Sequence, residues 1–242
     1  MGYTQFTLSD EFLRIAGWIV KHIKDCGDFG LIEFDFPFPV YGLKPPWISG
    51  LANAEAMEVL LKTPDGEYIE KARLLLKSFS ISIDSGGVAL KESHDRWWYS
   101  EYVREKPPMV LNGMMIILLA IHDFYEKTGD SLAISLFKKG LNSLCFHLKE
   151  FDFRGLSRYD LTGRITSHEY HRLHIRLLEK LYRLTGCKSL KEAISRWRPG
   201  KLFVYRLVVY PNPKDYFVFG VNSVSVLSLV FLLQLFSKFV KK

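Results

Sequence analysis

The stretch 157–174 holds an unusual concentration of side chains that can bind or transfer a proton. Its ionisable members are Arg158, Tyr159, Asp160, Arg164, His168, Glu169, Tyr170, His171, Arg172 and His174. Tyrosines, histidines and carboxylates that share a site can move protons to and from a substrate, and arginines bind its negative charge. A simple connection between two helices requires none of these groups. We therefore place the first candidate site here, on a loop that runs into a helix.

A second group of aromatic and acidic residues, at 94–102, reads His-Asp-Arg-Trp-Trp-Tyr-Ser-Glu-Tyr. Glu101 can serve as an acid or a base, but a glutamate between arginines is also typical of a surface ion pair. Trp97, Trp98 and Tyr99 either pack in the core or form a wall on which a sugar ring stacks. We expect this group to complete the site of the first stretch.

The polar residues of the first stretch also have purely structural interpretations. Tyr159 and Asp160 could form a turn with a packed ring. His171 and His174 are spaced to share a helix face, yet few acids lie near them, which favours a structural or substrate-contacting role over a metal site. No P-loop, GxGxxG, GxSxG or HExxH motif occurs in the sequence. We therefore expect no metal and no cofactor.

Most of the remaining chain is predicted to be helical. Apolar residues recur at helical spacing over 8–24, 49–62, 67–79, 110–128, 131–150, 169–184 and 189–197. Ser9 or Asp10 is placed to cap the first helix. Helix pairs that recur at intervals of roughly 35 to 45 residues predict either a solenoid or an α/α toroid whose loops build a cleft. We expect small β-hairpins at 81–90 and 201–219.

Composition is consistent with one well-packed domain that binds an acidic partner. The chain has 242 residues, 48% of them apolar, and a formal net charge of +7. Phosphate backbones and uronic-acid polymers both suit such a charge. Because the lysines and arginines are scattered through the helices, we expect no nucleic-acid partner. The three cysteines are far apart in sequence and are expected to be unpaired thiols. Trp18 and Trp197 are expected in the core.

The two ends of the sequence bear on location. The N-terminal residues carry no secretory signal, so a cytoplasmic location is the default expectation. Residues 218–236 are 19 residues without a charge, followed by lysines at 238, 241 and 242. That length suits a membrane-spanning helix, whereas the asparagine, serines and glutamine within it favour a buried helix that closes the domain. Membrane association through this segment stays open.

Several short motifs, taken in order over about 10–197, resemble the C-terminal domain of the D-glucuronyl C5-epimerases. They are Pro-Trp-Ile-Ser-Gly-Leu-Ala at 46–52, Glu101-Tyr102, Leu111-Asn112-Gly113, Ser-Arg-Tyr-Asp-Leu at 157–161, Tyr-His-Arg-Leu-His at 170–174, and Arg196-Trp197. The resemblance implies a mainly α fold, an incomplete α/α toroid of antiparallel helical hairpins with small β-hairpin insertions. The family's toroid follows β-rich domains that residues 1–242 lack, so a β-rich partner domain or chain is expected, and a homodimer is an alternative assembly.

The resemblance also implies roles for individual residues. The catalytic groups would be Glu101, Tyr102, Tyr159 and Tyr170. Expected substrate contacts are Trp47, His94, Trp98, Asn112, Arg158, Arg164, His171 and His174. The family's arginine after Tyr-Asp-Leu is replaced by Thr162, so Arg158 or Arg164 would have to supply the cation that binds the substrate carboxylate.

The implied activity is C5 epimerisation of a uronic acid, of the D-glucuronate to L-iduronate type, within an anionic polysaccharide or glycan. A proton leaves C5 and returns on the other face, which requires two acid/base groups and a partner for the developing enolate. A polysaccharide lyase with the same proton abstraction and a non-catalytic glycan-binding module are the alternatives. Residues 1–200 would form the epimerase-like domain and 201–242 a C-terminal extension.

Overall fold

The structure is a computed structural model that describes residues 9–211, 213–214, 216–217, 219–225 and 228. It is mainly helical, with small antiparallel sheets. The helices are α1 (Asp10–His22), α2 (Gly50–Leu61), α3 (Gly66–Ser78), α4 (Leu111–Thr128), α5 (Ser131–His147), α6 (His168–Thr185), α7 (Lys188–Trp197) and α8 (Phe203–Val209), with 3₁₀ turns η1 (Pro39–Tyr41), η2 (Ile83–Ser85) and η3 (Arg198–Lys201). The strands are β1 (Ile23–Asp25), β2 (Gly30–Phe34), β3 (Trp47–Ile48), β4 (Ala89–Lys91), β5 (Trp97–Tyr99), β6 (Asp152–Phe153) and β7 (Leu156–Ser157).

Side-chain caps and glycines set the helix ends where the sequence predicts them. The Ser9 hydroxyl accepts a hydrogen bond from the backbone N–H of Phe12 at 3.2 Å and caps α1. Gly129 and Gly186, in the left-handed conformation, end α4 and α6. The seven predicted helices are therefore confirmed, with ends that differ by a few residues.

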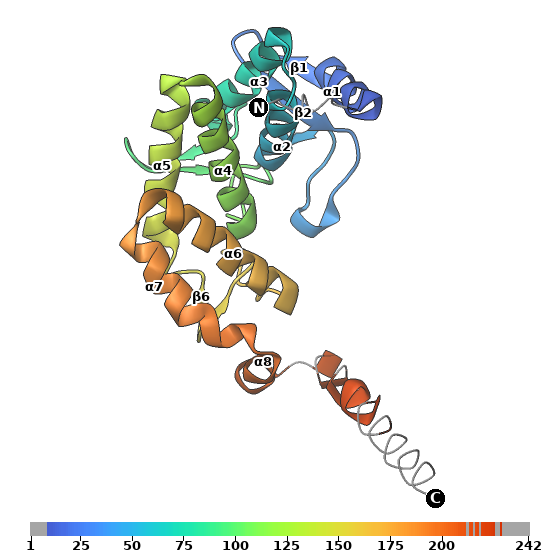
Figure 1. Cartoon of the computed structure of the whole chain (residues 1–242), viewed down its shortest axis with the longest axis vertical. Coiled ribbons are helices and arrows are strands. Elements are labelled where there is room, and N and C mark those ends of the chain that lie inside the picture. The colour runs from blue at the N-terminus through green and yellow to red at the C-terminus, as the bar shows by residue number, and fades with distance from the viewer. Residues whose placement is uncertain (1–8, 212, 215, 218, 226–227, 229–242) are drawn as a thin grey trace, which may run out of the picture.

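The helices of the main body pack as successive hairpins. α2, α4 and α6 contact one another in turn, and each also packs against the helix that follows it, α3, α5 or α7. Figure 1 shows these pairs following one another along a curved stack. The predicted helical hairpins with small β insertions are thus confirmed, while the toroid itself stays a prediction.

Fully buried aromatic residues hold the hairpins together. Trp98 stacks on Phe151 with ring centroids 5.7 Å apart, and the Tyr99 hydroxyl donates to the backbone carbonyl of Leu136 at 2.7 Å. Of the two interpretations of this aromatic run, the core is therefore the correct one for Trp98 and Tyr99. Trp197 is also buried, as predicted, but Trp18 is 60% exposed and stacks on its neighbour His22, so its core assignment is wrong.

Two local predictions about β structure need correction, and one sheet was not predicted. The range 201–219 contains helix α8 instead of a hairpin, because Leu207 packs inward at helical spacing and tertiary contacts override β propensity. The hairpin expected at 81–90 forms between β4 and β5, so the tryptophan run is itself a strand. The sequence analysis missed the antiparallel sheet β1–β2–β3 that precedes α2.

Candidate functional site

The two polar stretches of the sequence meet at a pocket of about 340 Å³. It is lined by Phe38, Val40, Tyr41, Tyr102, Tyr159, Arg164, Ile165, Thr166, Ser167 and Tyr170. All three tyrosines predicted to be catalytic, and one of the two candidate arginines, therefore line one pocket. A larger, mostly apolar hollow of about 510 Å³ between α1, β2 and α2 contains none of these tyrosines.

Glu101 lies behind the pocket wall, in the loop that follows β5, and its carboxylate packs against Gly113 in the first turn of α4. It is 7% exposed, and its Oε2 atom has no hydrogen-bond partner among the described residues. Burial raises the pKa of Glu101 to about 7; a hydrogen bond with Tyr102 opposes this rise and the Glu55 carboxylate adds to it. The carboxyl group is thus poised to take up or release a proton near neutral pH.

Two glycines explain why Glu101 can occupy this position. A β-carbon at Gly113, in the first turn of α4, would overlap the Glu101 carboxylate. A β-carbon at Gly50 would lie 2.5 Å from the Ser100 carbonyl oxygen, which accepts the Gly50 N–H at 2.9 Å. The motifs Ser-Gly-Leu-Ala and Leu-Asn-Gly thus bring the starts of α2 and α4 against the Ser100–Glu101 backbone.

The tyrosines of the pocket form one continuous group. Burial, together with the nearby Glu101, raises the pKa of both Tyr102 and Tyr159, so both phenols are neutral at physiological pH and available as hydrogen-bond donors. The Tyr159 and Tyr170 rings meet edge to face, with centroids 5.2 Å apart. Tyr170 is the most accessible of the three, at 42% exposed.

Asp160 organises the cationic side of the pocket. Its Oδ2 atom accepts from the Tyr41 hydroxyl at 2.7 Å and from Arg164 at 2.7 and 2.8 Å. Its Oδ1 atom accepts from the backbone and hydroxyl of Thr162 at 2.9 and 2.6 Å. The Arg164 guanidinium lies over the Tyr41 ring at 4.5 Å and the Tyr159 ring at 5.1 Å. Asp160 therefore holds Arg164 at the pocket while Thr162 closes the turn.

Arg158 is placed differently from Arg164. Its guanidinium lies over Phe153 at 5.4 Å, and the residue does not line the pocket. Of the two arginines that could compensate for Thr162, the structure therefore brings only Arg164 to the tyrosines.

His171 and His174 fasten the tyrosine loop to α6. The His171 Nδ1 atom accepts from the backbone N–H of Ser157 at 3.0 Å, so its ring proton lies on Nε2 and donates to the Trp197 carbonyl at 3.0 Å. His174 Nδ1 lies 2.9 Å from the Ser157 hydroxyl. Burial lowers the pKa of both rings, to about 3 for His174. Both are buried and neutral, which suits a positioning role better than carboxylate binding.

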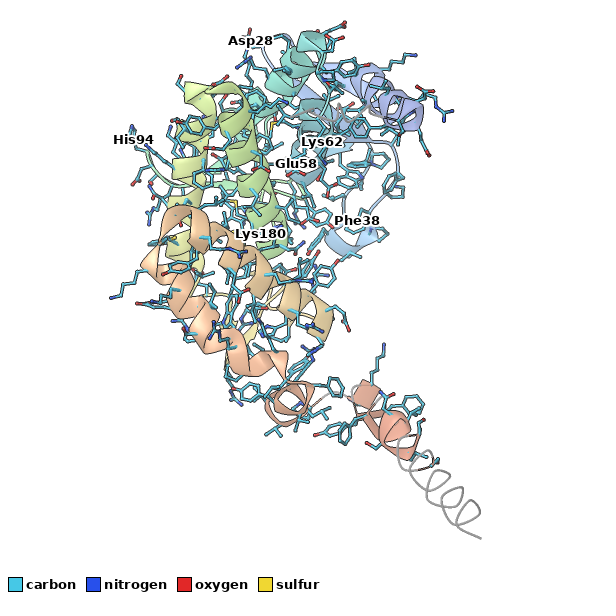
Figure 2. All side chains as sticks on the ribbon, in the orientation of Figure 1. Asp28, Phe38, Glu58, Lys62, His94 and Lys180 are labelled. Atoms are coloured by element: carbon cyan, nitrogen blue, oxygen red, sulfur yellow. The ribbon has the colours of Figure 1, made fainter. Side chains whose placement is uncertain are left out.

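The remaining predicted substrate contacts lie outside the pocket lining. Trp47 is 9% exposed and stacks on Phe34, Asn112 is buried in α4, and Trp98 is in the core. His94 is exposed between β4 and β5, and Figure 2 shows it on the opposite side of the molecule from Phe38. Among the described residues, no group of three or more His, Cys, Asp or Glu side chains could hold a metal ion.

The sequence analysis missed the part of the pocket that comes from the loop before β3. Three residues at or next to η1 line the pocket together with residues of the 157–174 stretch: Phe38, Val40 and Tyr41. Their only sequence signal is a loop rich in proline and aromatic residues at 35–46, which indicates ordered packing but no partner.

Comparison with known proteins agrees with this geometry. The family described as D-glucuronyl C5-epimerase C-terminus matches residues 26–199. The chain is also similar to the uncharacterized protein MJ1128 of Methanocaldococcus jannaschii, with 32% identity over 202 residues. That alignment covers 81% of the chain and 64% of MJ1128, so the chain spans less than two thirds of its relative. The matched range contains the pocket tyrosines, Glu101 and Arg164. By this match, the chain belongs to the D-glucuronyl C5-epimerase C-terminal family.

Proposed function

We propose that the chain is a glycuronyl C5-epimerase-like domain that acts on a uronic-acid unit of an anionic glycan. The observation that carries the proposal is the pocket in which Tyr102, Tyr159 and Tyr170 surround one space beside Arg164. Family membership supports carbohydrate epimerisation as the reaction class. The stack of helical hairpins is the part of an α/α toroid that this domain would contribute, and a β-rich partner domain or chain would complete the assembly.

In the proposed reaction, the proton at C5 leaves to a group on one side of the sugar and a new proton arrives from the other side. Glu101, with its pKa of about 7, is the internal base, and Tyr102 relays the proton because it lies between Glu101 and the pocket. Tyr170, the most accessible phenol, donates to the opposite face, with Tyr159 as its neighbour. After the product leaves, Glu101 releases its proton to solvent and Tyr170 takes one up, which returns the protein to its starting protonation state.

Arg164 would bind the substrate carboxylate. Removal of the C5 proton places negative charge on that carboxylate, and a fixed guanidinium stabilises such charge in a partly enclosed site. Asp160 holds the Arg164 side chain through Nε and Nη2, which leaves further N–H groups available to a substrate.

Two other functions share this geometry. A polysaccharide lyase also removes the C5 proton but then expels the C4 substituent, which leaves an unsaturated uronate. A glycan-binding module would keep the aromatic pocket without turnover.

The experiment incubates the protein with glucuronate-containing oligosaccharides and analyses the products by NMR and ultraviolet absorbance. Iduronate without ultraviolet absorbance supports the epimerase. An unsaturated product would assign the lyase, and bound but unchanged sugar would assign the binding module.

A further inference from the structure

The segment that follows the helical body exposes an unusual amount of apolar surface. From Leu202 to Val224 the exposed apolar side chains are Leu202, Val204, Val208, Tyr216, Phe217, Phe219, Val221 and Val224, at 44% to 76% exposure. Figure 1 shows α8 and the described residues that follow it at one end of the molecule, beyond α7. A segment this rich in exposed valine and phenylalanine is typical of a surface that a partner covers.

α8 fixes the start of this segment to the body. Leu207 is buried, the Tyr205 hydroxyl donates to the backbone carbonyl of Arg154 at 2.9 Å, and the Phe203 ring lies 5.9 Å from the His168 ring. Because these contacts use one side of α8, Val204 and Val208 point away from the body at 61% and 76% exposure.

The polar residues within the segment do not prevent contact with lipid. The Ser223 hydroxyl donates to the backbone carbonyl of Phe219 at 2.8 Å, and the Ser225 hydroxyl donates to that of Val221 at 2.9 Å. Serines that bond within their own helix present no unsatisfied donor to an apolar phase. Ser223 and Ser225 are therefore compatible with contact between this segment and lipid.

Charge identifies the partner. Residues 202–242 contain five basic residues, of which Arg206 is buried, and one acidic residue, so more than half of the chain's net charge of +7 arises in this segment. The uncharged stretch 218–236, of which the greater part lies outside the described residues, is followed by lysines at 238, 241 and 242. No helix among the described residues is long and apolar enough to cross a bilayer.

We propose that the exposed apolar side chains of the described residues 202–211, 213–214, 216–217 and 219–225 dock the protein on an anionic lipid surface. The exposed valines and aromatic residues enter the boundary between headgroups and acyl chains, and the lysines bind anionic headgroups. A second copy of the chain is a poorer occupant, because self-association would bring two strongly basic segments together. The proposal does not depend on the chemistry at the tyrosine pocket.

Flotation with lipid vesicles tests the proposal on the full chain. One set of vesicles is pure phosphatidylcholine and the other also contains phosphatidylserine. The test variant carries Val204→Ser, Val208→Ser and Phe217→Ser. The control variant replaces exposed apolar residues of the body, at 48% to 58% exposure, through Ile15→Ser, Phe146→Ser and Leu184→Ser.

We expect the wild type and the control to float with the phosphatidylserine vesicles, and the test variant to bind them at least tenfold more weakly. Replacing the lysines at 238, 241 and 242 by glutamine should weaken binding about fivefold for each charge removed. Circular dichroism checks that the variants are folded. Failure of the wild type to float, or equal flotation of the test variant, would overturn the proposal. So would a wild-type oligomer that the test variant converts to monomer without any binding to vesicles.

Discussion

Replacing Glu101 by glutamine should stabilise the protein at high pH. Folding raises the pKa of this carboxyl from an ordinary value of 4.5 to about 7. The folded state therefore holds the proton more tightly than the unfolded chain, and the free energy of unfolding falls as pH rises from about 4.5 to 7. At about 1.4 kcal/mol per pKa unit, the loss is about 3 kcal/mol. About a quarter of this loss has already occurred at pH 5, so roughly 2 kcal/mol of it falls between pH 5 and pH 8.

Chemical denaturation at pH 5 and pH 8 measures this effect. Glutamine resembles the protonated carboxyl, so Glu101→Gln should raise the free energy of unfolding by about 2 kcal/mol more at pH 8 than at pH 5. In a thermal scan at pH 8, where the full loss of about 3 kcal/mol applies to the wild type, the midpoint of the variant should lie about 6 to 12 °C higher. Glu105→Gln removes the same charge from an exposed position of the same loop and should change little. A gain that is equal at both pH values, or a loss at pH 8, would refute the burial argument.

Three further changes test the packing around the pocket. Gly113→Ala places a methyl group against the Glu101 carboxylate and should cost about 1 to 3 kcal/mol of unfolding free energy, whereas an unchanged denaturation midpoint would contradict the overlap. Asp160→Asn replaces an acceptor with a donor in a buried hydrogen-bond network and should lower the free energy of unfolding by about 2 kcal/mol. Calorimetry should also show weaker binding of uronate oligosaccharides. Binding as tight as that of the wild type would show that this network does not support the binding site. The Sγ atoms of Cys145 and Cys187 lie 2.9 Å apart, so a disulfide oxidant should join them with a loss of two hydrogens, and two free thiols after oxidation would contradict this.

The local signals of the sequence were sufficient for the helical framework. Apolar spacing, with serine or aspartate caps on five helices and glycine stops on two, is local to each helix, so α1 to α7 could be located without tertiary information. α8 could not, because its valines and tyrosines favour a strand and only contacts of residues such as Leu207 with the body make it helical. The proximity of Cys145 to Cys187 likewise depends on how α5 meets α7, which no sequence spacing reveals.

The sequence predicts which motifs contain side chains suited to proton transfer. It does not predict which of those side chains face the pocket, because long-range packing decides that. The resemblance pointed to three tyrosines that line one pocket, while their catalytic role stays a prediction. His171 and Trp98 carry equally suggestive chemistry, yet both are buried by long-range packing. Tyr41 was missed because its partner Asp160 lies 119 residues away in the sequence.

The most direct test of the central claim is solvent deuterium incorporation at C5 of glucuronate oligosaccharides, followed by NMR. Wild type, Glu101→Gln and Tyr170→Phe are compared under identical conditions, with Glu105→Gln as the control for loss of charge. The account predicts label with the wild type and the control, strong loss of label in both site variants, and no unsaturated product. Absence of label with a folded wild type that binds the sugar, or full labelling by both site variants, would contradict the assignment of this pocket to C5 proton transfer.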